Sequence, residues 1–405
     1  MAVIGREAVR RRRAFWLLAV TFGLFLFAAA APSPLYAVYA SRWRFSAVTL
    51  TEVFAVYALA LLIALLLTGS LSDSIGRRPV ILVALVIQVA SMGLFVLAAD
   101  TSWLFAGRIA QGVATGIATS ALAASFVDLQ PPDDPTLAPL VNSATPILGL
   151  ALGAIASAVL VQYAPYPLQL VYVLMIAAFV AVGAGIIAIA EPGLRRPGLT
   201  LRPRVGVERG LRRQFIAALP SLIAGWAVGG FYLSLGPSLA LQVAGSANHL
   251  LGGLSIFILG GIGSAAIVAV RAWPPSRAMT YGGLALVCGL AVAVASVLIK
   301  SPVLFFASNV ITGFGFGVGW LGVLRTLIGL ASPTSRAALV AAIFIVAYLA
   351  FAIPAVIAGY AVTRIGLHDA ALWYGVGVGL LALGGLAGTL VVGRRTHGAG
   401  IRVRP

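Results

Sequence analysis

The sequence predicts an all-α membrane protein with twelve membrane-spanning helices in two similar halves. Of its 405 residues 61% are hydrophobic, and the mean hydropathy of +1.06 is far above that of soluble domains. Apolar stretches that reach the length of about 20 residues needed to cross a bilayer recur along the chain. Lipid accepts only segments that satisfy their own backbone hydrogen bonds, so we expect these long stretches to be helices.

Each half contributes six expected helices. Those of the first half occupy residues 14–40, 48–70, 79–99, 102–128, 137–162 and 168–190. Those of the second half occupy residues 214–242, 249–270, 278–299, 302–330, 335–362 and 369–392. The polar segment between them holds seven arginines, three prolines and four glycines. We therefore expect an N-terminal bundle at 1–190, a cytoplasmic linker at 191–213 and a C-terminal bundle at 214–405.

The formal charge of +17 is spread between the apolar spans. Nucleic-acid binding would need the basic residues on one patch or stripe, so no nucleic-acid partner is expected. Cytoplasmic loops of membrane proteins retain Lys and Arg. With both termini inside, 21 of the 27 basic residues fall on the cytoplasmic side and four on the other. This bias predicts a multi-pass protein of the inner (plasma) membrane with both termini in the cytoplasm.

The most specific motif lies between the second and third expected helices and reads Gly69-Ser70-Leu71-Ser72-Asp73-Ser74-Ile75-Gly76-Arg77-Arg78-Pro79. Gly69 permits close approach of two helices, and Gly76 permits a tight turn. Asp73 is placed to pair with the nearby arginines.

This motif resembles the G-x-L-x-D-x-x-G-R-R/K signature of the major facilitator superfamily, which occupies the same loop. The resemblance implies the fold of that family, two six-helix bundles related by a pseudo-two-fold axis along the membrane normal. It also implies that the loop latches a cytoplasmic gate, with gate residues Gly69, Leu71, Asp73, Gly76, Arg77 and Arg78.

In that family the aspartate and arginine form a charge relay with an acid at the inner end of the fourth helix. The matching residues here are Asp73, Arg77 and Asp128. Asp128 equally fits a solvated acid at a helix end, beside Asp133 and Asp134.

The fourth expected helix contains Arg108-Ile109-Ala110-Gln111-Gly112-Val113-Ala114-Thr115-Gly116. A charge near the centre of a spanning helix costs roughly 2.5 to 3.5 kcal/mol and usually faces a cavity or a partner. The stretch resembles the R-x-x-Q-G signature of proton-coupled drug transporters in the superfamily, which implies a part in proton transfer for Arg108 and Gln111. The alternative is that Arg108 extends to the outer surface, since only about 9 Å of helix rise separates it from Ser102.

The fifth expected helix contains Gly149-Leu150-Ala151-Leu152-Gly153-Ala154-Ile155-Ala156-Ser157-Ala158. It is similar to the G-x-x-x-G-P-x-x-G-G signature of antiporters, but Ala154 replaces the proline, and Ser157 and Ala158 replace the glycine pair. Small residues favour close helix packing. The partial match leaves both export and uptake open.

Glu52 is the one acid among ten that begins a span. A proton site needs a titratable group within reach of the cavity, so Glu52 is a candidate for proton coupling. Glu52 also follows Thr49 by three residues, as in a capping box that satisfies the free amides of a helix start. Both interpretations stay open.

Polar and aromatic residues in apolar helices indicate a central cavity between the halves, where substrate binds at mid-membrane depth in such folds. We expect its lining to include Tyr36, Tyr57, Asn142, Trp226, Tyr232, Asn309 and Tyr348. Helix packing or an interfacial aromatic belt is the alternative for each. An apolar, weakly charged cavity suits a lipophilic, neutral or cationic compound better than a phosphate.

The expected function is secondary active transport of small molecules by alternating access, as proton-coupled efflux of amphipathic or drug-like compounds. The alternative is proton-linked or facilitated uptake of a sugar, organic acid or other metabolite. The expected partners are the substrate, protons as coupling ion and the lipid bilayer, with the chain acting as a monomer.

Enzyme chemistry is not expected. The sequence has no H-E-x-x-H or G-x-S-x-G motif. Its three histidines, His249, His368 and His397, fall in expected loops or the tail. Cys288 is the single cysteine, so neither a cofactor nor a metal site is expected.

Overall fold

The computed structural model describes residues 2–193, 205–332 and 334–398, and within these ranges the chain forms helices and no strand. Residues 194–204 of the expected linker lie outside the described residues. The first bundle contains α1 (Ala2–Ala30), α2 (Pro32–Trp43), α3 (Ala47–Thr68), α4 (Leu71–Ile75), α5 (Arg77–Val96), α6 (Thr101–Leu129), α7 (Leu137–Tyr163) and α8 (Leu170–Ala188). The second contains the short turn η1 (Arg209–Leu211), α9 (Arg212–Ser234), α10 (Gly236–Ala244), α11 (Leu250–Ala269), α12 (Pro275–Leu298), α13 (Pro302–Leu330) and α14 (Arg336–Gly398).

Twelve membrane crossings arise from eleven helical stretches. Within the described ranges, eleven stretches are long and apolar enough to cross a bilayer. The last of them covers 55 residues of α14, about 80 Å of helix against a hydrocarbon core of about 30 Å. Gly366 interrupts it with φ 82° and ψ 162°, so α14 makes two crossings. The prediction of twelve spanning helices is confirmed.

Two of the expected helices are each divided into a longer and a shorter helix. The segment expected at 14–40 divides into α1 and α2 at Pro32, which has no N–H to donate to the carbonyl of Ala28. The segment expected at 214–242 divides into α9 and α10 beside Pro237. The break recurs at the corresponding position of both halves, which is the internal repeat of the fold.

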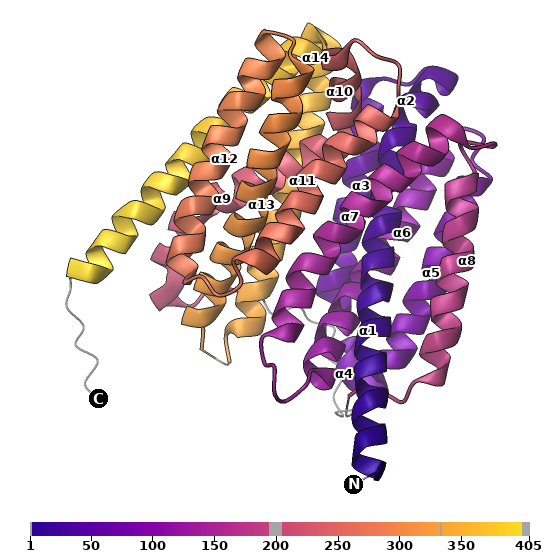
Figure 1. Ribbon diagram of the computed structural model, residues 1–405, viewed down its shortest axis with the longest axis vertical. Coiled ribbons are helices and arrows are strands. Elements are labelled where there is room, and N and C mark those ends of the chain that lie inside the picture. The colour runs from indigo at the N-terminus through magenta and orange to yellow at the C-terminus, as the bar shows by residue number, and fades with distance from the viewer. Residues whose placement is uncertain (1, 194–204, 333, 399–405) are drawn as a thin grey trace.

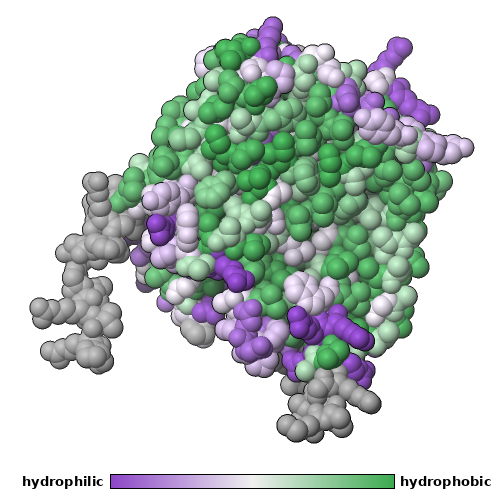
Figure 2. Space-filling view, viewed as in Figure 1, coloured by the Kyte–Doolittle hydropathy of each residue, from purple (hydrophilic) through white to green (hydrophobic). Residues whose placement is uncertain are grey.

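The two bundles stand side by side, α1 to α8 on one side and α9 to α14 on the other (Figure 1). The start of α1, the short helix α4 and the end of α14 point to one side of the molecule, which we call the terminal face. The opposite side, where α2 and α10 end, is the distal face. Figure 2 shows a broad hydrophobic belt between hydrophilic patches near both ends, as a protein embedded in a bilayer requires.

Helices α7 and α3 of the first bundle pack against α11 and α14 of the second. Small residues make the α7 to α11 contact close: a Cβ at Gly253 would overlap Ala158 and lie 2.7 Å from the carbonyl oxygen of Ala154. Between α3 and α14, the rings of Phe54 and Phe351 pack with their centroids 4.8 Å apart and their planes tilted by 43°. These two contacts form the interface in which the central cavity lies.

Candidate functional site

Three of the expected gate residues form a charge cluster on the terminal face. The Arg77 guanidinium contacts a carboxylate oxygen of Asp73 at 2.5 Å through Nη1 and one of Asp128 at 3.1 Å through Nε. Arg77 Nη1 also donates to Ser72 Oγ at 2.7 Å. The structure thus brings Asp73, Arg77 and Asp128 together, although 51 residues separate the arginine from Asp128 in the chain.

Local backbone geometry positions Arg77 at this point. Helix α4 ends at Gly76, whose φ of 107° is a conformation that residues with a side chain rarely adopt. The chain turns there and α5 begins directly with Arg77. Leu71 opens α4 and packs against the core of the first bundle. The expected close helix approach at Gly69 is wrong, because a Cβ there would meet only the carbonyl of Leu65, one turn earlier, at 3.4 Å.

Glu191 belongs to this cluster and was not expected from the sequence, which places it in the linker. Its carboxylate accepts hydrogen bonds from the backbone N–H of Arg77 at 2.6 Å and of Arg78 at 3.3 Å. It therefore satisfies the free amides at the start of α5, where an anion is favoured. The Arg78 side chain donates to the Ile187 carbonyl. The chain after α8 is fastened to the α4 to α5 turn by these contacts.

Arg108 is completely buried, so the expectation that it could extend to the outer surface is wrong. Its Nε donates to Tyr36 Oη at 2.7 Å, and its Nη1 donates to the Ala29 carbonyl at 2.8 Å and to Gln111 Oε1 at 2.6 Å. Nη2 has no hydrogen-bond partner among the described residues. The guanidinium also lies over the Tyr57 ring, 5.0 Å from its centroid.

The break between α1 and α2 explains why Arg108 and Gln111 are held here. Because Pro32 has no N–H, the carbonyl of Ala28 loses its helical donor, and Gln111 Nε2 donates to it instead at 2.9 Å. Ser157 of α7 donates to the Ala31 carbonyl at 2.6 Å. Polar side chains of α6 and α7 therefore satisfy the backbone of the broken helix inside the bilayer.

The small residues of α7 face two different helices. A Cβ at Gly149 or Gly153 would overlap the carbonyl oxygen of Gly23 or Phe27, so this face of α7 lies directly on α1. The alanines of α7, by contrast, face α11 of the second bundle. Close packing, which the sequence predicted for this stretch, thus operates both within the first bundle and between the bundles.

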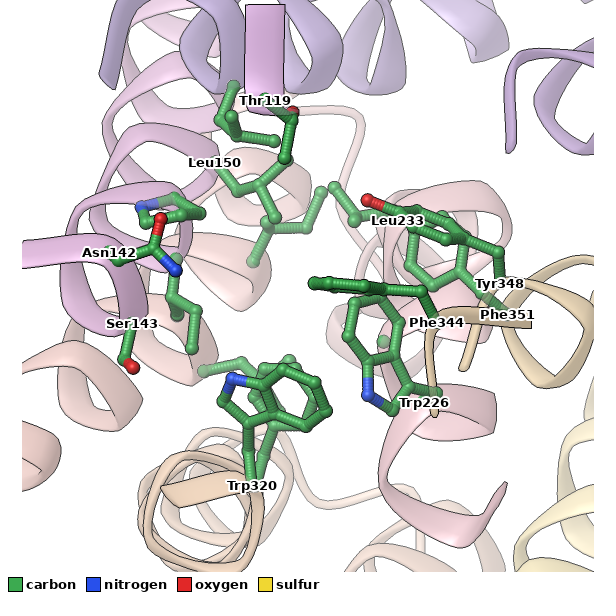
Figure 3. A pocket seen from close by; sticks show the side chains of 18 of the residues that line it. Thr119, Asn142, Ser143, Leu150, Trp226, Leu233, Trp320, Phe344, Tyr348 and Phe351 are labelled. Carbon is green, nitrogen blue, oxygen red and sulfur yellow. The ribbon is translucent and has the colours of Figure 1, made fainter. Parts of the chain in front are cut away.

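A cavity of about 130 Å³ lies between the two bundles (Figure 3). Four of the seven expected cavity residues line it, Tyr57 and Asn142 from the first bundle and Trp226 and Tyr348 from the second. The lining is otherwise mainly apolar and rich in aromatic rings. Trp320 also lines the cavity, and further lining residues that the sequence did not single out for it include Thr119, Ser143, Phe316, Phe344 and Phe351. Among all the described residues that line this cavity, none is charged.

The other three expected cavity residues lie elsewhere. Tyr36 accepts the hydrogen bond from Arg108. Tyr232 donates to Asn309 Oδ1 at 2.6 Å, and Asn309 Nδ2 donates to the Ser255 carbonyl at 3.4 Å, so these two polar residues satisfy each other inside the second bundle. They tie α9 to α13 and α11 and are not among the described residues that line the cavity.

Glu52 lies partly exposed in the second turn of α3 and is not among the described residues that line the cavity. The capping box expected for it is wrong. Helix α3 begins at Ala47, three residues earlier than a cap at Thr49 requires, and Ser46 is its N-cap, accepting from the Thr49 N–H at 3.2 Å.

The distal ends of the two bundles are in direct contact. The His249 N–H, at the start of α11, donates to Gln162 Oε1 of α7 at 2.9 Å. Burial lowers the pKa of the His249 imidazole. Between α3 and α14, a Cβ at Gly359 would overlap Thr51. The two bundles therefore leave no room for a side chain at Gly359 and are joined by a hydrogen bond at Gln162 on the distal side.

On the other side the cavity extends toward the terminal face. Asn142 lies five residues after the start of α7 and Leu324 six residues before the end of α13. At 1.5 Å of rise per residue, both are within about 9 Å of the terminal ends of their helices. In Figure 3 the Asn142 amide from one bundle and the two tryptophan rings from the other border the same space.

Two bundles of spanning helices around a central cavity define an integral membrane transport protein. The family model of the Major Facilitator Superfamily matches residues 14–354, and the chain belongs to this family. No functionally curated protein matches the sequence.

Solved transporters share the fold at low sequence identity. A bacterial homolog of the human lysosomal transporter Spinster, in an inward-facing and unoccupied conformation, is 14% identical with a TM-score of 0.76, over 94% of this chain and 97% of its own. A mutant of the nucleoside transporter NupG is 12% identical with a TM-score of 0.71, over 92% and 98%. The human organic anion transporter MFSD10 is 18% identical with a TM-score of 0.68, over 93% and 99%.

Proposed function

We propose that the protein is a secondary transporter that moves small amphipathic molecules across the inner membrane by alternating access, and that it exports them in exchange for protons. The observation that carries the proposal is the central cavity. Side chains of both bundles line it, and the bundles touch on its distal side. A rocking motion of one bundle against the other would move the opening from one face to the other.

The chemistry of the cavity supports an amphipathic substrate. Aromatic rings offer surface for an apolar body, while two of the lining polar atoms, Asn142 Oδ1 and Trp226 Nε1, have no hydrogen-bond partner among the described residues. Buried polar atoms of this kind are commonly satisfied by water or a ligand. They are suited to orient one polar group of a bound molecule.

Proton coupling rests on the likeness of the α6 motif to that of proton-coupled family members. Arg108 and Gln111 donate hydrogen bonds to the backbone at the α1 to α2 break. Protonation of a nearby group would change the electrostatic environment of these hydrogen bonds. Glu52, in α3, is the proposed proton carrier. Asp73, Arg77 and Asp128 are the proposed latch of the terminal face, which we place in the cytoplasm because 21 of the 27 basic residues belong to that side.

Uptake of an organic acid or another metabolite is the second candidate. It is favoured by the charge of the cavity wall, since the described lining holds no carboxylate that would attract a cation.

The test uses the protein in proteoliposomes with an acidic interior and two fluorescent amphiphiles, the anion 8-anilinonaphthalene-1-sulfonate and the cation ethidium. Accumulation of either compound that nigericin abolishes by collapsing the pH gradient supports proton-coupled transport. Accumulation that survives nigericin supports the uptake candidate without proton coupling. The proposal fails if neither compound crosses faster than in protein-free vesicles while the purified protein remains monodisperse.

A further inference from the structure

The guanidinium of Arg108, which lies behind the cavity wall, has no carboxylate as a counter-ion. Of the ten acidic residues, all of which the structure describes, none contacts Arg108 and none lines the central cavity. The guanidinium donates its hydrogen bonds to neutral oxygens of Tyr36, Ala29 and Gln111. A guanidinium buried without a counter-ion is unfavourable, and an anion brought close to it relieves that penalty.

Two routes lead from Arg108 to the cavity, one through a single side chain and one through two. Its guanidinium carbon lies 5.0 Å from the centroid of the Tyr57 ring, and Tyr57 lines the cavity. It lies 6.0 Å from the centroid of Phe54, whose ring packs against Phe351 of the cavity wall. Because these rings are apolar and the region is buried, little solvent screens the charge.

The wall itself provides hydrogen-bond donors for an anion. The indole Nε1 of Trp226 is a donor without a partner among the described residues. The hydroxyl of Tyr57, on the wall formed by the first bundle, is a second buried donor without a partner among the described residues. Asn142 Oδ1, across the cavity from Trp226 (Figure 3), is an unpartnered acceptor and adds no donor for an anion. One donor from each bundle suits a small planar group with two oxygens better than a phosphate, which needs more donors and carries more charge.

Aromatic walls alone would also attract a cation through the faces of the rings. Here the buried guanidinium already occupies a face of Tyr57 and Tyr36. A second cation in the cavity would meet its repulsion with no carboxylate to offset it. The charge of the site therefore opposes the cationic substrate that the sequence left open.

We propose that the central cavity selects amphipathic monocarboxylates, and that Arg108 acts through the Tyr57 ring as the source of this preference. The proposal rests on the proposed function, since it specifies which amphipathic molecules the cavity takes. It makes Arg108 a positioning charge for the substrate in addition to its hydrogen bonds at the α1 to α2 break.

The test compares three probes of equal size that differ in charge: 4-phenylbutyrate, 4-phenylbutanamide and 4-phenylbutylammonium. Their dissociation constants for the purified full chain in detergent at pH 7.5 are measured by isothermal titration calorimetry. A unit charge about 9 Å from the guanidinium, at an effective dielectric constant of about 20, predicts that the carboxylate binds about twentyfold more tightly than the amide. The ammonium is expected to bind about twentyfold more weakly than the amide.

Three variants locate the source of the preference. Arg108→Gln keeps hydrogen-bond donors but removes the charge, so the carboxylate and amide should bind equally. Arg108→Lys keeps the charge and should keep most of the preference. Arg325→Gln is the matched control, because Arg325 donates to the Arg271 carbonyl on the terminal face and does not line the cavity. It should behave as wild type.

Each outcome decides the proposal. Equal binding of carboxylate and amide by wild type, or tighter binding of the ammonium, overturns the charge preference and leaves transport of amphipathic molecules standing. A preference that persists in Arg108→Gln, with the amide still bound at the wild-type affinity, overturns the role of Arg108. Failure of all three probes to bind protein that unfolds cooperatively contradicts the cavity as a site for amphipathic molecules, and so contradicts the proposed function.

Discussion

Asp128→Asn removes one of the two carboxylates that hold the Arg77 guanidinium on the terminal face. The Asp128 oxygen lies 3.1 Å from Arg77 Nε, and the exposed fractions of the two side chains are 30% and 11%. A charge-assisted hydrogen bond in such a partly buried setting stabilises the fold by about 1.5 kcal/mol. The Asp73 carboxylate is 48% exposed and lies four residues before Arg77, across the turn at Gly76, and an exposed ion pair of this kind contributes about 0.4 kcal/mol.

The two contributions can be separated by double-mutant cycles on the purified protein. The free energy of unfolding is measured by SDS titration in mixed micelles for wild type, Asp128→Asn, Arg77→Gln and the double variant. The cycle isolates the pairwise term from the other effects of each substitution. A second cycle with Asp73→Asn provides the matched comparison.

We expect a coupling of about 1 to 1.5 kcal/mol for Arg77 with Asp128, and about a third of that for Arg77 with Asp73. Coupling below about 0.3 kcal/mol for the Asp128 pair lies within the additivity of independent sites. That result, or a larger coupling for the Asp73 pair, would refute the reasoning that burial ranks the two contacts.

Three further predictions concern stability. Gly153→Ala should lower the free energy of unfolding by about 1 to 3 kcal/mol, because the added Cβ would overlap the Phe27 carbonyl. Gly261→Ala is the control and should change the free energy of unfolding little, because the nearest atom to its Cβ is 4.0 Å away. Equal effects of the two substitutions in SDS titrations would contradict the close packing. Tyr232→Phe should cost about 1 to 2 kcal/mol by leaving Asn309 Oδ1 without its donor, and an unchanged unfolding midpoint would contradict this. Burial lowers the pKa of His249 below its unfolded value of about 6.5. The unfolded state therefore binds the proton first, and the free energy of unfolding falls as the pH drops through that value. His249→Gln should remove part of this loss of stability between pH 7 and 5.5, and identical pH profiles of wild type and variant would contradict the prediction.

Hydropathy was sufficient to predict the number and order of the spanning helices, because the length of an apolar run identifies a spanning helix. The breaks inside the runs were harder to predict. Pro32 and Pro237 interrupt helices in segments that read as continuous, since nothing in the local pattern tells a kinked helix from a divided one. The expected cap of α3 was wrong for a related reason: Ser46 and Thr49 are both residues that cap helices well, and which of them accepts the backbone hydrogen bond is decided by the folded backbone.

The charge cluster on the terminal face could be predicted in part from the sequence. Asp73 and Arg77 are opposite charges four residues apart in one short loop, which local reasoning can pair, and the family resemblance supplied Asp128. Glu191 had no such signal, because it follows α8 and meets the α5 start only through the fold. Its place directly after a spanning helix, in a segment otherwise rich in arginine, is the one feature of the sequence that could have made Glu191 a candidate for the cluster.

The cavity was predicted by polarity, and that rule has a physical limit. A polar side chain in an apolar helix needs a partner, but the partner can be another side chain, as Tyr232 and Asn309 show. Phe316, Phe344 and Phe351 line the cavity without any polar atom. A phenylalanine facing lipid and one facing a cavity are identical in sequence, so only coordinates distinguish them.

The most direct test of alternating access fixes the distal contact between the bundles. Gln162→Cys and His249→Cys, in a Cys288→Ala background, place one thiol on each side of the 2.9 Å contact between α7 and α11. A reducible bis-methanethiosulfonate cross-linker joins them, and uptake of the transported amphiphile into proteoliposomes is measured before and after reduction. If the bundles rock against each other, cross-linking should stop transport and reduction should restore it, with either single-cysteine protein unaffected. Transport that continues at the full rate through cross-linked protein would contradict alternating access through the central cavity.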